Sequence, residues 1–417
     1  MKLLLIMAWR NLWRHGRRTV LTAGTVALGL AMLLVFLGLG DGSHAQMIDS
    51  AVRLGSGHVV FQALGYQELG GLERTMVRSQ TEPVVSWLAE KEEDYRIEGV
   101  VARIFASALA SSASGSSGVF LMGIQPGPEG RVSRFSSKMS DGEFLEDGQT
   151  QQIVIGEGVA RKLKVRIGDK VVLMAQAAHS PDIESSLVRV GGILKTGQEN
   201  VDQTLILAPL DTSQEFFKLH DQLHQLAVLL PDQSDSLRLA AEARAAFPDL
   251  EVLSWQGALP ELHDFIQVDD GGNYVFHVFL FLLIAFLVLN TLLMSVLERR
   301  KEFTFLDAIG LNPQQRFGLV MLEAFFIASL ACLLGFVIGY SGNLYLEIYG
   351  LPLHVFNMEE GSNVAGVAFD PVMYSKLSWG RIAQSLGAVF TMTFLLAVWP
   401  ARRAAAPGNI QLLASGR

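Results

Sequence analysis

Two long apolar runs, Tyr274–Val296 and Phe317–Tyr340, constrain the fold of this chain more than any other feature. Each run is roughly 23 residues long, enough for a helix that rises about 1.5 Å per residue to cross the hydrocarbon core of a bilayer. Two further runs, Thr19–Leu39 and Ile382–Trp399, are also long enough to span. The chain is therefore predicted to be a membrane protein with four transmembrane helices.

Polar residues are concentrated between the first and second apolar runs, in residues 41–272. This stretch has no spanning run, and strand-like and helix-like patterns alternate along it. The predicted fold class is an α-helical membrane protein with four transmembrane helices plus a large mixed α/β extracytoplasmic domain between helices 1 and 2. A net charge of −8 argues against nucleic-acid binding. The single cysteine, Cys332, excludes an intrachain disulfide.

Three basic clusters set the predicted orientation. They lie at the N-terminus, in residues 298–316 and after Pro400, so the positive-inside rule places all three in the cytoplasm and the α/β domain outside. A secretory signal peptide cleaved after Ala45 is the alternative for the N-terminal stretch, although a signal h-region is shorter, at about 7–15 residues. The predicted parts are an amphipathic interfacial helix (1–18), transmembrane helices (19–40, 273–297, 317–341, 382–400), the α/β domain (41–272), a cytoplasmic coupling segment (298–316), an outer loop (342–381) and a cytoplasmic tail (401–417).

Local patterns predict the elements of the α/β domain. Pro83 suits the first turn of a helix, Thr212 with Glu215 forms a candidate capping box, and the Ser/Gly tract Ser111–Gly118 predicts a hairpin tip. Predicted helices are Pro83–Lys91, Ser213–His220, Ser234–Ala246 and Gln256–Val268. Predicted strands are His58–Phe61, Gly118–Ile124, Gln152–Ile155, Lys170–Met174, Leu187–Leu194, Thr204–Leu207 and Gln225–Leu230.

The charged segment between the second and third apolar runs has a helical pattern of its own. Phe303, Leu306 and Gly310 fall on one face, and the preceding turn is charged. A helix that lies at the membrane surface between two spans is suited to receive a push from a partner. The alternative is a short cytoplasmic connection whose positive charges only set the orientation.

The sequence Glu298–Gly310, E-R-R-K-E-F-T-F-L-D-A-I-G, resembles the E-R-x-R-E-I-x-x-L-R-A-I-G signature of FtsX/MacB-type ABC transporter permeases. Ala8–Thr22 is similar to the family's N-terminal pattern, and Pro400–Ala405 is similar to its ending. Asp307 departs from the signature, because a basic residue is common there. The resemblance implies that an ABC ATPase subunit (LolD-like), which supplies ATP and Mg²⁺, docks on the coupling residues Glu298, Arg299, Lys301, Glu302, Phe303, Leu306 and Gly310.

Several passages of the α/β domain resemble the lipoprotein-releasing (LolC/LolE-like) branch of this family. They include Gly123–Pro126, Ile153–Asp169 and Val190–Gly197 followed by Asp202. The resemblance implies a permease pair, homodimeric or heterodimeric, that extracts lipoprotein cargo from the inner membrane, with the large domain in the periplasm. The alternatives are a MacB-type efflux permease and an FtsX-like mechanotransmission protein that controls a periplasmic hydrolase.

Few other residues carry a site signal. No G-x-x-x-x-G-K-[ST] motif exists, so this chain is not predicted to bind a nucleotide cofactor in that way. No catalytic residue and no metal site are predicted for this chain either. His220 and His224 are spaced i, i+4 on a possible helix, but their sequence lacks the glutamate of H-E-x-x-H, so a solvated helix end is favoured over a metal site.

Three residues of the third span are assigned to helix packing. Gly335 and Gly339 form a G-x-x-x-G pair, and Glu323 is expected to face protein because a carboxylate in lipid is expensive. The stretch Gln176–Ser186 has no apolar periodicity and predicts an exposed loop. The family resemblance makes its residues Pro181, Asp182, Ile183 and Glu184 a candidate contact for a soluble periplasmic carrier.

Overall fold

The computed structural model describes residues 2–14, 16–353, 363–364, 367–368 and 372–406. The chain divides into two compact units, which are considered separately. One unit, the helix bundle, comprises Met1–Ala45, Gln267–Pro352 and Val372–Arg417. The other, the α/β domain, comprises Gln46–Ile266 with Leu353–Pro371. The predicted outer loop 342–381 and tail 401–417 lie partly outside the described residues.

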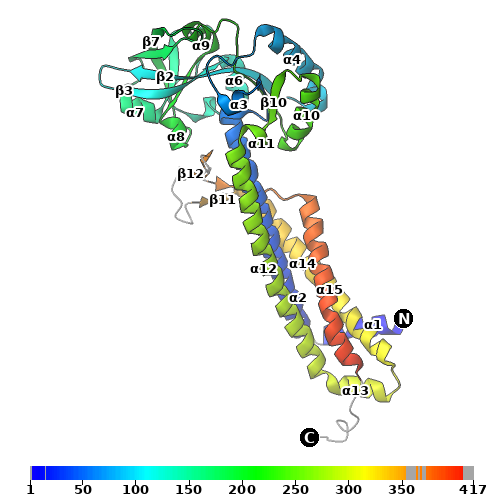
Figure 1. Ribbon diagram of the computed structural model, residues 1–417. Helices are drawn as coiled ribbons and strands as arrows, with labels where there is room; N and C mark the ends of the chain where they lie inside the picture. Colours follow the sequence, from blue (N-terminus) through cyan, green and yellow to red (C-terminus); the bar gives the residue numbers. More distant parts are fainter. Residues whose placement is uncertain (1, 15, 354–362, 365–366, 369–371, 407–417) are drawn as a thin grey trace. The chain divides into compact units, whose positions relative to one another are not determined.

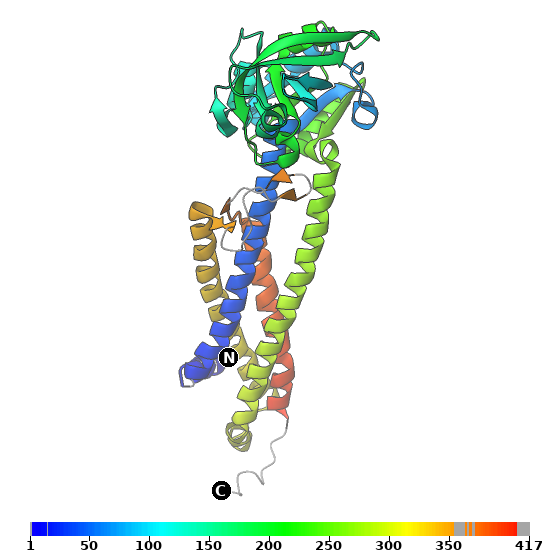
Figure 2. The same ribbon diagram turned by 90° about the vertical axis from the view of Figure 1, so that its left-hand side faces the viewer.

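Within the described residues, four helices are long and apolar enough to cross a membrane. Figures 1 and 2 both show α2 and α12 side by side, with α1 and α13 towards the same end of the bundle. The predicted fold class is confirmed by these helices and by the α/β domain described below. The bundle helices are α1 (Lys2–Arg14), α2 (Gly16–Ala51), α12 (Pro260–Glu298), α13 (Arg300–Ala308), α14 (Pro313–Tyr349) and α15 (Trp379–Ala405).

The long helices extend beyond the predicted spans because polar residues at their ends have partners. Helix α2 continues past residue 40, and Asp41 Oδ1 lies 3.1 Å from the guanidinium of Arg381. His44 Nε2 lies 2.8 Å from Asp269 Oδ2 on α12. The sequence predicted that the fourth transmembrane helix ends at Pro400. Helix α15 instead continues to Ala405. Ala401 and Ala404 are buried beyond the proline, so packing holds the last turn in place.

The α/β domain is built on a ten-stranded mixed sheet, all within its described residues. The strands lie in the order β10-β1-β9-β2-β3-β8-β5-β7-β4, and β6 pairs with both β2 and β7. Their bounds are β1 Val59–Ala63, β2 Gly99–Ser111, β3 Ser116–Ile124, β4 Met139–Gly142, β5 Gln152–Gly156, β6 Lys170–Gln176, β7 Ile183–Leu194, β8 Leu205–Pro209, β9 Gln225–Leu229 and β10 Leu250–Ser254.

Side chains that alternate along the strands form two cores on opposite faces of the sheet. In β2, Ile104 and Ala106 enter the larger core, and the intervening Phe105 packs against the smaller one. The larger core is covered by α4 (Arg78–Glu90), α7 (Glu157–Leu163), α9 (Leu210–Phe217) and α10 (Ser236–Ala246). The smaller core includes Leu54, from the π-helix η1 (Val52–Ser56) that follows α2, and Phe135, after α6 (Pro126–Val132). Shorter helical segments are α3 (Tyr66–Leu69), α5 (Glu92–Tyr95), α8 (Glu199–Asp202), α11 (Trp255–Ala258), η2 (Ser136–Lys138) and η3 (Gln233–Asp235).

Each predicted strand overlaps an observed one, and the Ser/Gly tract forms the tip of the β2–β3 hairpin, where Ser111 pairs with Ser116. Two helix starts were wrong. Helix α4 begins at Arg78, where Gln80 Oε1 accepts from the N–H of Val77, so Pro83 lies inside the helix. Helix α9 begins at Leu210, so Thr212 is no cap and instead donates its hydroxyl to Thr150 O. Strands β2, β4 and β10 of the sheet were not predicted.

Candidate functional site: the coupling helix and its supports

Helix α13 is a short helix with a well-defined end. The N–H of Gly310 donates to Asp307 O and the N–H of Leu311 to Leu306 O, each at 3.0 Å, which is the Schellman pattern. This ending needs a left-handed residue, and Gly310 supplies it with φ +94°. The predicted coupling residue Gly310 therefore ends α13 and lets the chain turn into α14. The first turn of α14 is capped by Asn312 and Gln315.

The two faces of α13 differ in exposure. Phe303 is 5% exposed and packs in the core of the bundle, and Leu306 packs beside it. Phe305 and Ile309 are apolar but 58% and 59% exposed. Together with Lys301 and Ala308 they form the outer face of α13, at spacing i, i+4, i+7, i+8.

The burial of Phe303 differs from the expectation that an ATPase subunit docks directly on this residue. The amphipathic period identified Phe303 and Leu306 as one face, but that face meets the bundle rather than the outside. The Arg299 guanidinium lies over the Phe303 ring at 5.3 Å, so the ring also covers a charged group. The apolar side chains that α13 presents outwards are Phe305 and Ile309.

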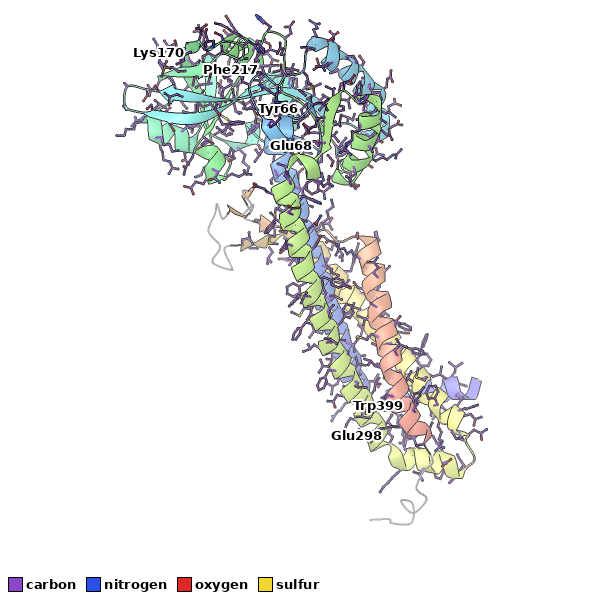
Figure 3. The ribbon with its side chains drawn as sticks, viewed as in Figure 1. Tyr66, Glu68, Lys170, Phe217, Glu298 and Trp399 are labelled. Atoms are coloured by element: carbon purple, nitrogen blue, oxygen red, sulfur yellow. The ribbon has the colours of Figure 1, made fainter. Side chains whose placement is uncertain are left out.

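A buried carboxylate joins three elements at the start of α13. Arg299 Nη1 donates to both oxygens of Glu323, at 2.9 and 2.8 Å, and Arg299 Nε donates to Glu302 at 2.7 Å. Asn11 Nδ2, on α1, donates to Glu323 Oε1 at 2.8 Å. Glu323 therefore faces protein, as expected for a carboxylate in a span. Figure 3 labels Glu298, the residue before Arg299, at this end of the bundle.

A second buried cation holds the other end of α13. Arg316 is 1% exposed on α14, and its Nη2 lies 3.0 Å from Asp307 Oδ1. The same guanidinium donates to the carbonyls of Ala405 and Ala406 at the end of α15, at 3.3 and 3.5 Å. An arginine is favourable there because the last carbonyls of a helix have no partner within it. Asp307, the charge reversal in the family signature, thus pairs inside the chain.

The two glycines assigned to helix packing lie where α14 contacts α2. A Cβ on Gly335 would come within 2.9 Å of Ala27 O, and one on Gly339 within 3.0 Å of the Ala31 Cα. Any side chain at either position would push the helices apart. Close packing at this face fixes α14 against the first spanning helix.

The predicted carrier loop is shorter than the sequence indicated. Strand β6 extends to Gln176 and pairs with Ile183, so only residues 177–182 connect the strands. Ala178 is buried, and its N–H donates to Phe217 O at 3.0 Å, so the turn folds back onto the domain instead of protruding. Pro181 and Asp182 are exposed, Ile183 is 75% exposed, and Glu184 pairs with Lys218.

The two histidines spaced i, i+4 do not share a helix. Helix α9 ends at Phe217, and His220 has φ +51° in the turn beyond it. His224 is fully buried, its Nδ1 accepts from the N–H of Phe105, and its Nε2 lies 3.1 Å from Leu72 O. Among the described residues, no group of three or more His, Cys, Asp or Glu side chains is placed to hold a metal ion.

Sequence reasoning missed the contributions of Asn11 and Arg316. Asn11 lies 312 positions from Glu323, so no local pattern could pair them. In the sequence, Arg316 is one of the positive charges of residues 298–316 that predict the orientation. The sequence does show that Glu323 is a charged residue in an apolar span and that Asp307 is an acidic residue in a basic segment, so each needs a partner. It does not show that these partners are Asn11 and Arg316.

Two family models match the chain. A model described as MacB-like periplasmic core domain matches residues 19–246, and one described as FtsX-like permease C-terminal matches residues 274–407. Together they cover the first long helix, most of the α/β domain, α13 and the remaining spans.

Two curated relatives match along most of their lengths. The lipoprotein-releasing system transmembrane protein LolC of Neisseria meningitidis is 22% identical over 404 residues, covering 93% of this chain and 91% of the relative. LolE of Haemophilus influenzae is 23% identical over 408 residues, covering 94% and 92%. Among solved structures, the extracellular domain of the transporter YknZ covers 47% of this chain and 98% of its own, at 18% identity and a TM-score of 0.32. The periplasmic region of MacB from Actinobacillus actinomycetemcomitans covers 48% and 88%, at 15% identity and a TM-score of 0.33.

Proposed function

The chain belongs to the family of ABC transporter permeases that carry a MacB-like periplasmic core domain and an FtsX-like C-terminal region, and from this premise we propose that it releases lipoproteins from a bacterial inner membrane. In this family ATP is hydrolysed by a separate subunit, in keeping with the lack of a G-x-x-x-x-G-K-[ST] motif here. The observation that carries the cargo assignment is the match to two lipoprotein-releasing proteins over more than nine-tenths of each.

The proposed mechanism starts at the outer face of α13. Phe305 and Ile309 offer an exposed apolar surface beside Lys301, suited to a groove on an ATPase subunit. Because Arg299 and Asp307 hold the two ends of α13 to α14, displacement of α13 by the ATPase must also displace the bundle. Work is needed because each CH₂ of a lipid anchor costs about 0.8 kcal/mol to expose to water.

The cargo is tested with the purified complex of this chain, its permease partner and the co-purifying ATPase. Native mass spectrometry should detect acylated lipoprotein, and reconstituted liposomes should release that lipoprotein to a soluble periplasmic carrier with ATP but not with a non-hydrolysable analogue. Release of small molecules or peptides, without lipoprotein, would replace the cargo with an efflux substrate. Activation of a periplasmic hydrolase without any transport would assign the chain to mechanical signalling.

The docking face gives a separate prediction. Phe305→Asp and Ile309→Asp should each weaken ATPase binding by about 2 kcal/mol, roughly thirtyfold, because the carboxylate replaces an apolar contact. The abundance of both variants should stay normal, since these side chains are exposed. Phe303→Asp should instead lower the amount of folded chain, because its carboxylate would be buried. Affinity pull-down with quantified membrane levels measures both effects.

The matched control is Gln314→Asp, which adds the same charge at an exposed position in the first turn of α14. An acidic residue near a helix N-terminus is well tolerated, so this variant should retain the ATPase. Normal ATPase recovery with Phe305→Asp and Ile309→Asp would show that the outer face of α13 is not the docking surface.

A further inference from the structure

Helix α1 and the start of α13 meet at one buried side chain, Glu323. On the basis of this juxtaposition we infer that α1 moves in response to α13 when the ATPase displaces α13. Asn11 and Glu323 are the positioning residues that link α1 to α13. The inference rests on the proposed function, because it concerns how the response to ATP spreads from α13. It adds a role for the N-terminal helix beyond lying at the membrane surface.

Because Glu323 is buried, its carboxylate depends on hydrogen-bond donors from the protein. Its side chain is 10% exposed and that of Arg299 is 6% exposed, so neither charge is well solvated by water. A buried carboxylate is retained only where donors satisfy it. Arg299 supplies two contacts from one nitrogen, and Asn11 supplies a further donor from α1. The amide of Asn11 is thus part of how this charge is accommodated.

Helix α1 is held against α14 by more than this bond. Ala8 and Leu12 are buried, and the Trp9 ring meets the Phe326 ring edge-on at 5.3 Å. The hydroxyl of Thr19, on α2, donates to Leu12 O at 2.8 Å. Helix α1 therefore has fixed contacts with two spanning helices.

The outer side of α1 has a different character. Ile6 and Trp13 are 60% and 66% exposed, and Arg10 and Arg14 are exposed beside them. Apolar and indole side chains next to arginines are typical of a helix in the lipid headgroup region. One side of α1 thus suits the membrane interface, while the other reaches Glu323.

Arg299 connects this contact to α13 itself. Its Nε donates to Glu302 on α13, and the next position after Glu302, Phe303, packs its ring under the guanidinium. Hydrogen bonds weaken steeply as their geometry departs from linear, so a shift of α13 that moves Arg299 must alter the contacts of Glu323. Because Asn11 shares Glu323 Oε1 with Arg299, α1 must respond to the same shift.

The first test separates coupling from folding. Asn11→Leu keeps the size of the side chain and leaves the Arg299–Glu323 pair, but it removes the α1 donor. Membrane abundance and ATPase pull-down should be unchanged, while lipoprotein released per ATP hydrolysed should fall about tenfold. Asn11→Gln keeps an amide donor and should recover much of the loss. The matched control is Ser329→Ala, which removes a hydroxyl that donates to Phe325 O within the same helix.

A second test needs no cargo. Arg14→Cys, in a chain whose only cysteine is replaced by Cys332→Ala, places a thiol at the exposed end of α1. In the ATPase-bound complex, the rate of modification by a soluble thiol reagent should differ between the nucleotide-free and ATP-bound states. The difference should disappear when Asn11→Leu is added.

The outcomes are distinguishable. A nucleotide-dependent rate that Asn11→Leu abolishes supports the inference even if the cargo is not lipoprotein. A rate that nucleotide never changes, or a change that persists in Asn11→Leu, overturns it even if lipoprotein release is demonstrated. Loss of ATPase pull-down in Asn11→Leu would also overturn it, because the residue would then support docking rather than coupling.

Discussion

Replacing Glu129 with leucine is expected to destabilise the α/β domain by about 3–5 kcal/mol, the usual result of removing one partner from a buried ion pair. Arg103 and Glu129 are both fully buried. Arg103 donates Nη2 to Glu129 Oε1 at 2.6 Å and Nε to Oε2 at 3.2 Å, and its Nη1 donates to Gly55 O. Glu129→Leu would leave the guanidinium with only that carbonyl.

Thermal unfolding of the purified chain in detergent measures this effect, and the melting temperature of the domain should fall by roughly 10 °C. The double variant Arg103→Met/Glu129→Leu should recover much of the loss, because no unpaired charge remains. Arg78→Met/Glu82→Leu is the control, since that pair is 70% and 61% exposed, and it should change stability by less than about 1 kcal/mol. A shift for Glu129→Leu no larger than the control's would mean that the pair contributes little.

Mild acid is expected to destabilise the same domain through two buried histidines. Burial lowers the pKa of His58 and of His224 to about 4 from the usual 6.5. His58 Nδ1 accepts from the N–H of Leu230, and His224 Nδ1 accepts from that of Phe105, so protonation would set a donor against a donor. The Nε2 of His224 lies 3.1 Å from Leu72 O, which fits the neutral ring with its proton on Nε2.

The direction of the pH dependence follows from these values. Between pH 6.5 and about 4 the unfolded chain binds protons that the folded domain does not, so stability is complete above pH 6.5 and declines as the pH falls. Each histidine should contribute up to about 3 kcal/mol of this loss. Urea unfolding followed from pH 7.5 to 4.5 measures the slope.

Substitutions of His58 and His224 test whether their imidazole rings cause the pH dependence of stability. His58→Asn and His224→Asn retain an acceptor near the Nδ1 position without a titrating group, so combining them should flatten the slope in this range. His220→Asn is the control, because His220 is exposed and asparagine tolerates its positive φ. An unchanged slope in the double variant would show that other groups account for the acid sensitivity.

Strands of the α/β domain were predictable where the local sequence is continuously apolar and were not where polar residues interrupt it. The strands rich in β-branched residues, such as β5 and β9, were found because their apolar runs are continuous. Strand β2 was missed because arginine, alanine and serine interrupt its apolar residues. Its neighbours β3 and β9 hold it in the sheet. The sequence predicts irregular structure for Gln176–Ser186 because polar residues dominate it, yet residues 183–186 belong to β7 and pair with β6.

The sequence by itself determined which segments can cross a membrane, the existence of an α/β domain between the first two, and the motif around α13. These follow from length, composition and local spacing, which need no partner. Tertiary structure alone decided that Phe303 faces the bundle while Phe305 and Ile309 face outwards, because an amphipathic period shows that a helix has an apolar face but not what covers it. It also decided that Asn11 and Arg299 share Glu323, because a buried charge takes its partners from whichever helices lie beside it, however distant in the chain.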